Sequence, residues 1–196
     1  MADLVTMAIN AARGKKGEAI YDPLLKPSAP LPPATPIQPL DPRMASIEDR
    51  RMKTLEPSTK AFVVAILAWA RGNGIPVILG ETHRSQAEQA RAIEEGKSAI
   101  KEGQTGWHQY GRAFHLVIVN PRTRLLDEEA YKKVGAEVRR RGGEWLGDKT
   151  LTTARGQVQD LAHFEYHPGL KLSSYRGSHL AKKEMAMAEK RAAKYG

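Results

Sequence analysis

The sequence contains no cysteine. Disulfide frameworks, thiol nucleophiles and thiolate metal sites are therefore excluded, and a metal ion could be held only by histidine, aspartate or glutamate side chains. Long apolar runs are also missing, because the longest one, Ala61–Ala70, has ten residues, whereas a bilayer crossing needs about 20. The N-terminal segment lacks the basic-then-apolar order of a secretory signal. We therefore expect neither a membrane span nor a signal peptide.

Basic side chains outnumber acidic ones: 31 lysines and arginines face 22 aspartates and glutamates among 196 residues, which gives a formal net charge of +9. Hydrophobic residues make up 41%, a share typical of a globular protein rather than a disordered chain. The length allows one medium domain with extensions, or two very small domains. The basic excess is explained either by solubility or by attraction to nucleic acid, lipid head groups or an anionic cell wall. Charge alone does not choose among these partners.

Eight of the twelve prolines lie between Pro23 and Pro42. Proline fixes φ and lacks an N–H group, so this stretch is predicted to be an extended spacer. We interpret residues 1–43 as a docking segment with a Pro-rich linker, residues 44–170 as the main domain and residues 171–196 as a basic helical tail. The tail has seven basic and two acidic side chains. It is predicted to be a solvated helix, with an anchor to an anionic polymer or DNA as the alternative.

The main domain mixes helical and strand-like patterns. Apolar residues recur on one helical face after Ser58, which can cap that helix, and Ser85 with Glu88 has the spacing of a capping box. The expected helices cover residues 57–71, 86–95 and 127–141. The expected strands cover residues 75–79, 113–119 and 161–167. Such scattered strands do not form a regular βαβ series, so the predicted fold class is α+β, with a small antiparallel sheet flanked by helices.

Four of the six histidines fall on or beside the last two expected strands. A hydrolytic zinc site needs three protein ligands and one open position, and His108, His115 and His163 could supply these ligands. Spacing alone leaves open the alternative that they are ordinary core or surface histidines. Strand alternation places Glu165 on the same side as His163. There it could orient a ligand ring, act as a base, or belong to a polar strand face.

Four sequence blocks resemble the LAS-type zinc peptidases, a group of D-alanyl-D-alanine carboxypeptidases, VanY-like enzymes and L-alanyl-D-glutamate endopeptidases that cut peptidoglycan stem peptides. Trp107–His115 is similar to the motif S-x-H-x-x-G-x-A-x-D, and Asp160–Glu165 is similar to D-x-P-H-F-E. Glu81–Gln89 is similar to s-G-Y-R-S-x-x-x-Q, and Gly142–Asp148 to G-x-E-W-G-G-D-W. The blocks occur in the family's order and cover about residues 57–168.

The resemblance implies a Zn²⁺ cofactor with His108 and His163 among its ligands, and Asp160 as the general base that takes a proton from the attacking water. It also implies that Arg84 binds a substrate carboxylate or carbonyl, and that Gln89 supports the wall of the substrate-binding site that Arg84 forms. The physical chemistry agrees, because a guanidinium matches a planar carboxylate through paired N–H donors. A carboxylate near the water can also relay its proton to the leaving amine.

Two positions depart from the family motif: its Asp ligand is His115 here, and its opening Ser is Gly106. Imidazole is a good zinc ligand, so we expect a metal site made of His108, His115 and His163. The alternative is a domain that has lost zinc and kept its fold, because an imidazole places its donor nitrogen differently from a carboxylate oxygen. Trp107 is predicted to line the substrate pocket.

The resemblance and the chain organisation together suggest a phage-encoded, zinc-dependent peptidoglycan peptidase that acts in phage entry or host lysis. Its expected locations are the virion, where residues 1–43 could dock to other virion or tail proteins, and the host cytoplasm with release to the cell wall. The alternative is a structural or cell-wall-binding virion protein with a degenerate, inactive peptidase domain. Nucleic-acid binding rests on charge alone, without a motif or an aromatic-basic platform, and is not expected.

Overall fold

A computed structural model describes residues 41–101, 103–120, 125–154 and 156–195, so most of the predicted docking segment and linker, residues 1–40, lies outside the described residues. The helices are α2 (Pro42–Thr54), α3 (Pro57–Gly72), α4 (Gln86–Glu94), the 3-10 helix η1 (Trp107–Tyr110), α5 (Glu128–Arg140), α6 (Leu172–Tyr175) and α7 (His179–Tyr195). The strands are β1 (Val77–Leu79), β2 (Ala113–Ile118), β3 (Glu144–Trp145), β4 (Thr150–Thr153), β5 (Gly156–Gln159) and β6 (His163–Glu165). None of the helices in these ranges combines the length and apolarity that a membrane crossing requires.

Helix α2 begins at the last proline of the Pro-rich run. Asp41 caps it by accepting a hydrogen bond from the backbone N–H of Arg43 at 2.8 Å. Pro42 occupies the first helical position, where a missing N–H costs nothing. This helix is absent from the sequence-based prediction because the prolines before it mask its start. The predicted linker boundary at residue 43 therefore falls inside the first turn of α2.

Side-chain caps also fix the next two long helices. The predicted capping box of α4 is confirmed, since the side chain of Ser85 accepts from the N–H of Glu88 and the side chain of Glu88 accepts from the N–H of Ser85. The predicted cap of α3 is wrong. Glu56, rather than Ser58, caps this helix, because its carboxylate accepts hydrogen bonds from the N–H groups of Ser58 and Thr59.

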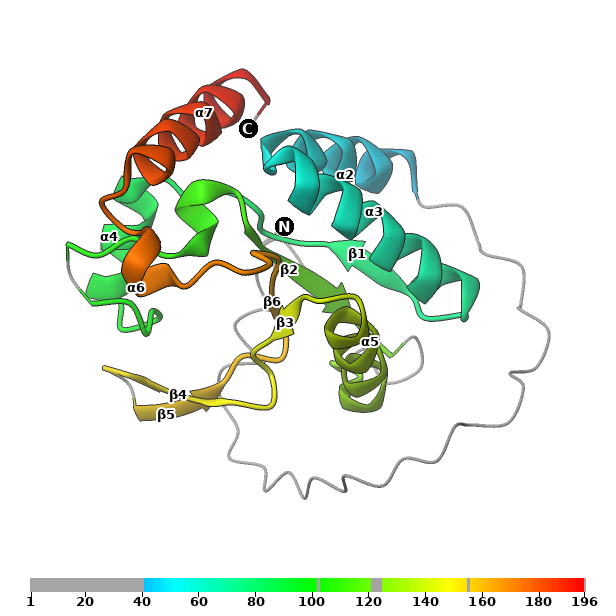
Figure 1. Cartoon of the computed structure of the whole chain (residues 1–196). Coiled ribbons are helices and arrows are strands. Elements are labelled where there is room, and N and C mark those ends of the chain that lie inside the picture. Colours follow the sequence, from blue (N-terminus) through cyan, green and yellow to red (C-terminus); the bar gives the residue numbers. More distant parts are fainter. Residues whose placement is uncertain (1–40, 102, 121–124, 155, 196) are drawn as a thin grey trace.

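Four strands form an antiparallel sheet in the order β1-β2-β6-β3 (Figure 1). Phe114 and Phe164 are direct partners on β2 and β6, and with Leu116 and Ile118 they belong to the hydrophobic core that also contains residues of α3 and α5. Alternate residues of the same strands face the other side of the sheet. The predicted α+β fold, with a small antiparallel sheet flanked by helices, is confirmed.

Several strands differ from the prediction for local reasons. β4 and β5 form a separate two-stranded sheet that is absent from the sequence-based prediction. Their residues are mostly polar and none of them is buried, so no apolar alternation marks these strands. β1 starts at Val77, after Pro76, which has no N–H to donate to a strand partner. The strand expected over residues 161–167 is confirmed only over His163–Glu165, because the N–H of His163 closes a turn on the backbone oxygen of Asp160 at 3.2 Å.

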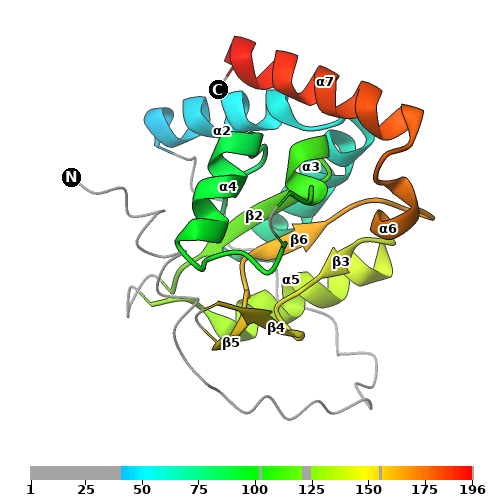
Figure 2. The same cartoon turned by 90° about the vertical axis from the view of Figure 1, so that its left-hand side faces the viewer.

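The predicted solvated helix at the C-terminus is wrong for one face of α7. Ala181, Glu184 and Ala188 are buried, and α7 lies along α2 in both views (Figures 1 and 2). Arg112, which lies between η1 and β2, donates hydrogen bonds to both carboxylate oxygens of Glu184, at 2.8 and 2.7 Å. This pair ties α7 to the segment that carries η1.

We expect Arg112→Ala to lower the free energy of unfolding by about 3 kcal/mol, because it leaves a buried carboxylate without its partner. The side chains of Arg112 and Glu184 are 10% and 8% exposed. Urea unfolding followed by circular dichroism measures the change. The control is Lys132→Ala, which breaks the pair with Glu129, whose side chains are 52% and 75% exposed, and should cost about 0.5 kcal/mol or less. Similar losses for both variants would contradict a firmly docked α7.

Candidate metal centre

The register of the sheet brings two histidines together. His115 on β2 is the direct cross-strand partner of His163 on β6. Both lie on the face of the sheet opposite to Phe114 and Phe164, which belong to the hydrophobic core. Directly opposed residues of antiparallel strands have their side chains in contact range. The Nε2 atom of His115 accordingly lies 3.1 Å from the Nδ1 atom of His163.

A third histidine, His108, comes from η1, whose two ends are tightly fixed. The side-chain oxygen of Gln109 accepts a hydrogen bond from the N–H of Gly106 at 2.6 Å. Gly111 ends η1 with a φ of 69°, and a Cβ atom there would lie 2.9 Å from the backbone nitrogen of Glu56. This position therefore requires glycine, both for its backbone conformation and for the close approach.

The rings of His108, His115 and His163, which we call the histidine cluster, converge on one point. Their centroids are 4.9 to 5.2 Å apart, and one nitrogen of each ring lies within 4.8 Å of the other two. Two nitrogen ligands of a tetrahedral zinc ion are about 3.3 Å apart, given Zn–N distances of about 2.0–2.1 Å. One pair of nitrogens, on His115 and His163, is close to this separation at 3.1 Å, and the nitrogen from the third ring lies within 4.8 Å of the others.

The outer nitrogen of each ring faces an oxygen atom that can only accept a hydrogen bond. Two of these pairs are hydrogen bonds, His108 Nδ1 with the backbone oxygen of Thr82 at 2.6 Å and His163 Nε2 with Glu165 Oε1 at 2.9 Å. The third, His115 Nδ1 with Glu81 Oε2, is a longer contact of 3.4 Å that lies outside hydrogen-bond geometry. Hydrogens on these outer nitrogens leave lone pairs on the inner nitrogens, which face one another. The Nε2 atom of His108 is buried and has no hydrogen-bond partner among the described residues. A cation between the rings would satisfy these lone pairs, so the residues fit a zinc ion.

Burial keeps His108 in the form that binds a metal. The residue is 4% exposed, and burial holds the pKa of His108 well below its usual value, with the nearby Arg84 acting in the same direction and Glu81 opposing it. Neutral imidazole is the metal-binding form. His108 is therefore neutral and able to act as a ligand at pH 7.

Asp160 lies beside the histidine cluster, in the turn before β6. Its Oδ2 atom is 3.9 Å from the Nε2 atom of His115. Its Oδ1 atom is buried and has no hydrogen-bond partner among the described residues. A buried carboxylate oxygen without a donor can accept a proton from water at the cluster, so this position fits the general base that the family resemblance implies.

Glu165 joins the cluster to a neighbouring histidine. Its Oε1 atom faces His163, and its Oε2 atom lies 3.0 Å from Nε2 of His167. Burial alone would raise the pKa of Glu165, but hydrogen bonds from the two histidines lower it to about 2. Burial lowers the pKa of His167, but Glu165 and Glu144 raise it overall. Glu165 is thus charged and holds the ring of His163, while His167 lies between two carboxylates that raise its pKa.

Trp107 is 5% exposed and takes part in a second apolar cluster. Its ring stacks on His167 with centroids 4.3 Å apart and also contacts Tyr110 and Tyr175. These contacts help to hold η1, and with it His108, against the rest of the domain. The predicted role of Trp107 in lining a substrate pocket stays a prediction.

Arg84 is held between Glu81 and Gln89. Its Nε and Nη2 atoms donate to the two carboxylate oxygens of Glu81 at 2.7 and 2.5 Å, and Nη1 donates to Gln89 Oε1 at 3.1 Å. Burial alone would raise the pKa of Glu81, but Arg84, His108 and His115 hold it well below its usual value. The paired donors of Arg84 are therefore directed at a carboxylate of this chain, and substrate binding by Arg84 stays a prediction.

Glu81 is the residue that sequence reasoning missed. In the block Glu81–Gln89, the motif position that points to a function is that of Arg84, whereas Glu81 stands at a weakly defined position of the motif. The available signal is its place two residues after the strand predicted over residues 75–79. Extending that strand by two residues brings Glu81 beside His115 on the neighbouring strand.

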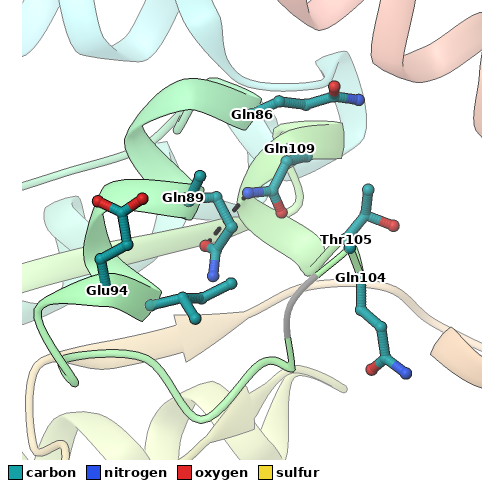
Figure 3. Close-up of a pocket in the computed structure, with 9 residues that line it drawn as sticks. Gln86, Gln89, Glu94, Gln104, Thr105 and Gln109 are labelled. Atoms are coloured by element: carbon teal, nitrogen blue, oxygen red, sulfur yellow. Dashed lines mark hydrogen bonds between the residues drawn. The ribbon is translucent and has the colours of Figure 1, made fainter.

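A cavity of about 510 Å³ lies between α4 and the segment that leads into η1 (Figure 3). Its wall includes Gln89 and Gln109, joined by a hydrogen bond of 3.2 Å, together with Gln104 and Thr105. The wall contains no residue of the histidine cluster. The cavity is therefore next to the candidate metal centre rather than part of it.

Comparison with known proteins shows what the chain is similar to. No protein-family model matches the chain. The solved structure of the Serratia marcescens L-Ala D-Glu endopeptidase ChiX is similar at a TM-score of 0.49 and 22% identity, over 65% of this chain and 89% of that chain. Over 99 residues the chain is 33% identical to the L-alanyl-D-glutamate peptidase of Listeria phage A118. The resemblance to the LAS-type peptidases is confirmed.

The match covers 48% of this chain and 34% of the phage protein, so the aligned part spans about a third of that relative. The position where the LAS-type motif has Asp is occupied by His115, one of the three rings of the histidine cluster. The imidazole reaches His163 in spite of its different shape, with 3.1 Å between the facing nitrogens. The same contact is compatible with a hydrogen bond between the two rings, so binding of a metal by His115 stays a prediction.

Proposed function

We propose that the protein is a zinc-dependent peptidase that cleaves peptidoglycan stem peptides at the bond between L-alanine and D-glutamate. The observation that carries this proposal is the convergence of three inner imidazole nitrogens beside the buried carboxylate of Asp160. The name and sequence similarity of the Listeria phage peptidase support the substrate class and the bond.

The histidine cluster would hold the zinc ion, which when bound supplies Lewis-acid chemistry by polarising a peptide carbonyl and making water acidic near neutral pH. Asp160 would take the proton of the attacking water on Oδ1 and pass it to the leaving amine. Glu165 and the backbone oxygen of Thr82 keep two of the ligand rings in place. The ligands are therefore oriented before substrate arrives, which lowers the cost of reorganisation.

Digestion of purified sacculi and of a muropeptide that contains the L-Ala–D-Glu bond tests the proposal, with products identified by mass spectrometry. We expect a new amino terminus at D-glutamate, loss of cleavage on treatment with dipicolinate, and recovery when zinc is added. Cleavage that resists the chelator would contradict the metal, and cleavage only at another bond would contradict the assigned specificity.

A structural or cell-wall-binding protein with an inactive domain would behave differently in the same assay. It would bind sacculi without releasing peptides, and the purified protein would contain no zinc. Action in phage entry or host lysis, from the virion or from the host cytoplasm, is part of our proposal. We also propose that residues 1–43 dock to other virion proteins. Most of these residues lie outside the described ranges.

A further inference from the structure

Glu81 lies two residues after the end of β1, where the chain continues alongside β2. The N–H of Gly80 donates to the backbone oxygen of His115 at 2.7 Å, and the N–H of His115 donates to that of Glu81 at 2.7 Å. A Cβ atom at Gly80 would lie 3.2 Å from the Cβ atom of His115, so a glycine permits this close approach. The Oε2 atom of Glu81 consequently lies 3.4 Å from the Nδ1 atom of His115.

Arg84 fixes the carboxylate of Glu81 in this place. Its paired N–H donors hold both carboxylate oxygens, and its remaining Nη1 atom is itself held by Gln89. A bidentate guanidinium pair restricts the orientation of the carboxylate plane. Each carboxylate oxygen can accept more than one hydrogen bond, so Oε2 can accept from Arg84 and still face His115.

We propose that Glu81 is a positioning residue that selects the tautomer and the ring orientation of His115 for metal binding. An aspartate, which the family motif has at this position, can bind a metal through either of two equivalent oxygens. An imidazole must instead present one nitrogen, here Nε2, and carry its hydrogen on the other, so it needs an acceptor at Nδ1. We assign this role to Glu81 Oε2, which lies 3.4 Å from Nδ1, in contact with it but outside hydrogen-bond geometry. This inference rests on the proposed function, because it assumes a metal at the histidine cluster.

Zinc affinity of the full chain, measured by competition with a chromophoric chelator, tests the inference without any activity assay. Glu81→Ala should weaken zinc binding about 10- to 100-fold, the usual effect of losing a partner that orients a ligand. Glu81→Gln keeps an acceptor oxygen and should recover part of the loss. The control Glu129→Gln removes a carboxylate on α5 that is 75% exposed, and should leave the affinity unchanged.

The same substitution in a His115→Asp background separates positioning from a general structural effect. Aspartate has no tautomer to select, so Glu81→Ala should there change zinc affinity by less than about twofold, whereas disturbance through Arg84 would weaken binding in both backgrounds. Equal losses in both backgrounds, or no loss with His115 present, would overturn the inference and leave the zinc site standing. A parent protein that binds no zinc would overturn the proposed function and this inference with it.

Discussion

His108→Ala should abolish stoichiometric zinc binding and lower kcat/KM for the L-Ala–D-Glu substrate by at least about 10³-fold, which corresponds to about 4 kcal/mol of transition-state stabilisation. The reason is the number of ligands. His115 and His163 come from adjacent strands and would remain, but a hydrolytic zinc ion is held by three protein ligands rather than two. Elemental analysis gives zinc per chain, expected at about one in the parent, and steady-state kinetics give the loss of activity.

His179→Ala is the matched control for this variant. His179 begins α7, is exposed and lies outside the histidine cluster, so zinc content and kcat/KM should be unchanged. Circular dichroism should show that both variants keep the parental fold, because removing one imidazole at the cluster leaves the hydrophobic core intact. A folded His108→Ala protein with about one zinc per chain would remove this residue from the ligand set.

The clearest correct prediction from the sequence concerns strand β2, whose alternation of side chains shows which residues face the core. The alternation along residues 113–119 separated the core residue Phe114 from His115, and the structure places them on opposite faces of the sheet. The direct pairing of His115 with His163 could not be read from either strand alone, because register depends on the turns and on the packing of the whole sheet. The places of His108, His115 and His163 on or beside two expected strands suggest a shared site, and the family resemblance then implies His108 and His163 as metal ligands.

The missed features depend on contacts between distant parts of the chain. Glu184 reads as one more solvated charge on a basic helix, and it is buried only because Arg112, 72 residues away in sequence, pairs with it. Glu81 gains its place beside His115 only once β1 lies next to β2. Local sequence patterns indicate which face of a helix or strand is apolar, but they do not indicate which charged side chains will form ion pairs with distant residues. Contacts of this kind between charged residues distant in sequence are therefore identified only from the structure.

Asp160→Asn should leave zinc bound and lower kcat by about 10²- to 10⁴-fold, because asparagine has the same shape but cannot accept the proton of the attacking water. The buried Oδ1 atom of Asp160, which has no hydrogen-bond partner among the described residues, is the position where that proton would be received. Zinc content and kcat measured on the same preparation separate this effect from the loss of a ligand.

Glu165→Gln distinguishes the base from the residue that orients a ligand. Glu165 is hydrogen-bonded to His163 and His167, so its loss should weaken zinc affinity about 10-fold or more, while kcat of the fully zinc-loaded protein falls much less than in Asp160→Asn. The reverse pattern, with activity kept by Asp160→Asn and lost by zinc-loaded Glu165→Gln, would transfer the role of general base to Glu165. Both carboxylates lie beside rings of the histidine cluster, Asp160 near His115 and Glu165 near His163. Only this pair of variants, compared at full zinc occupancy, therefore assigns the proton transfer to one of them.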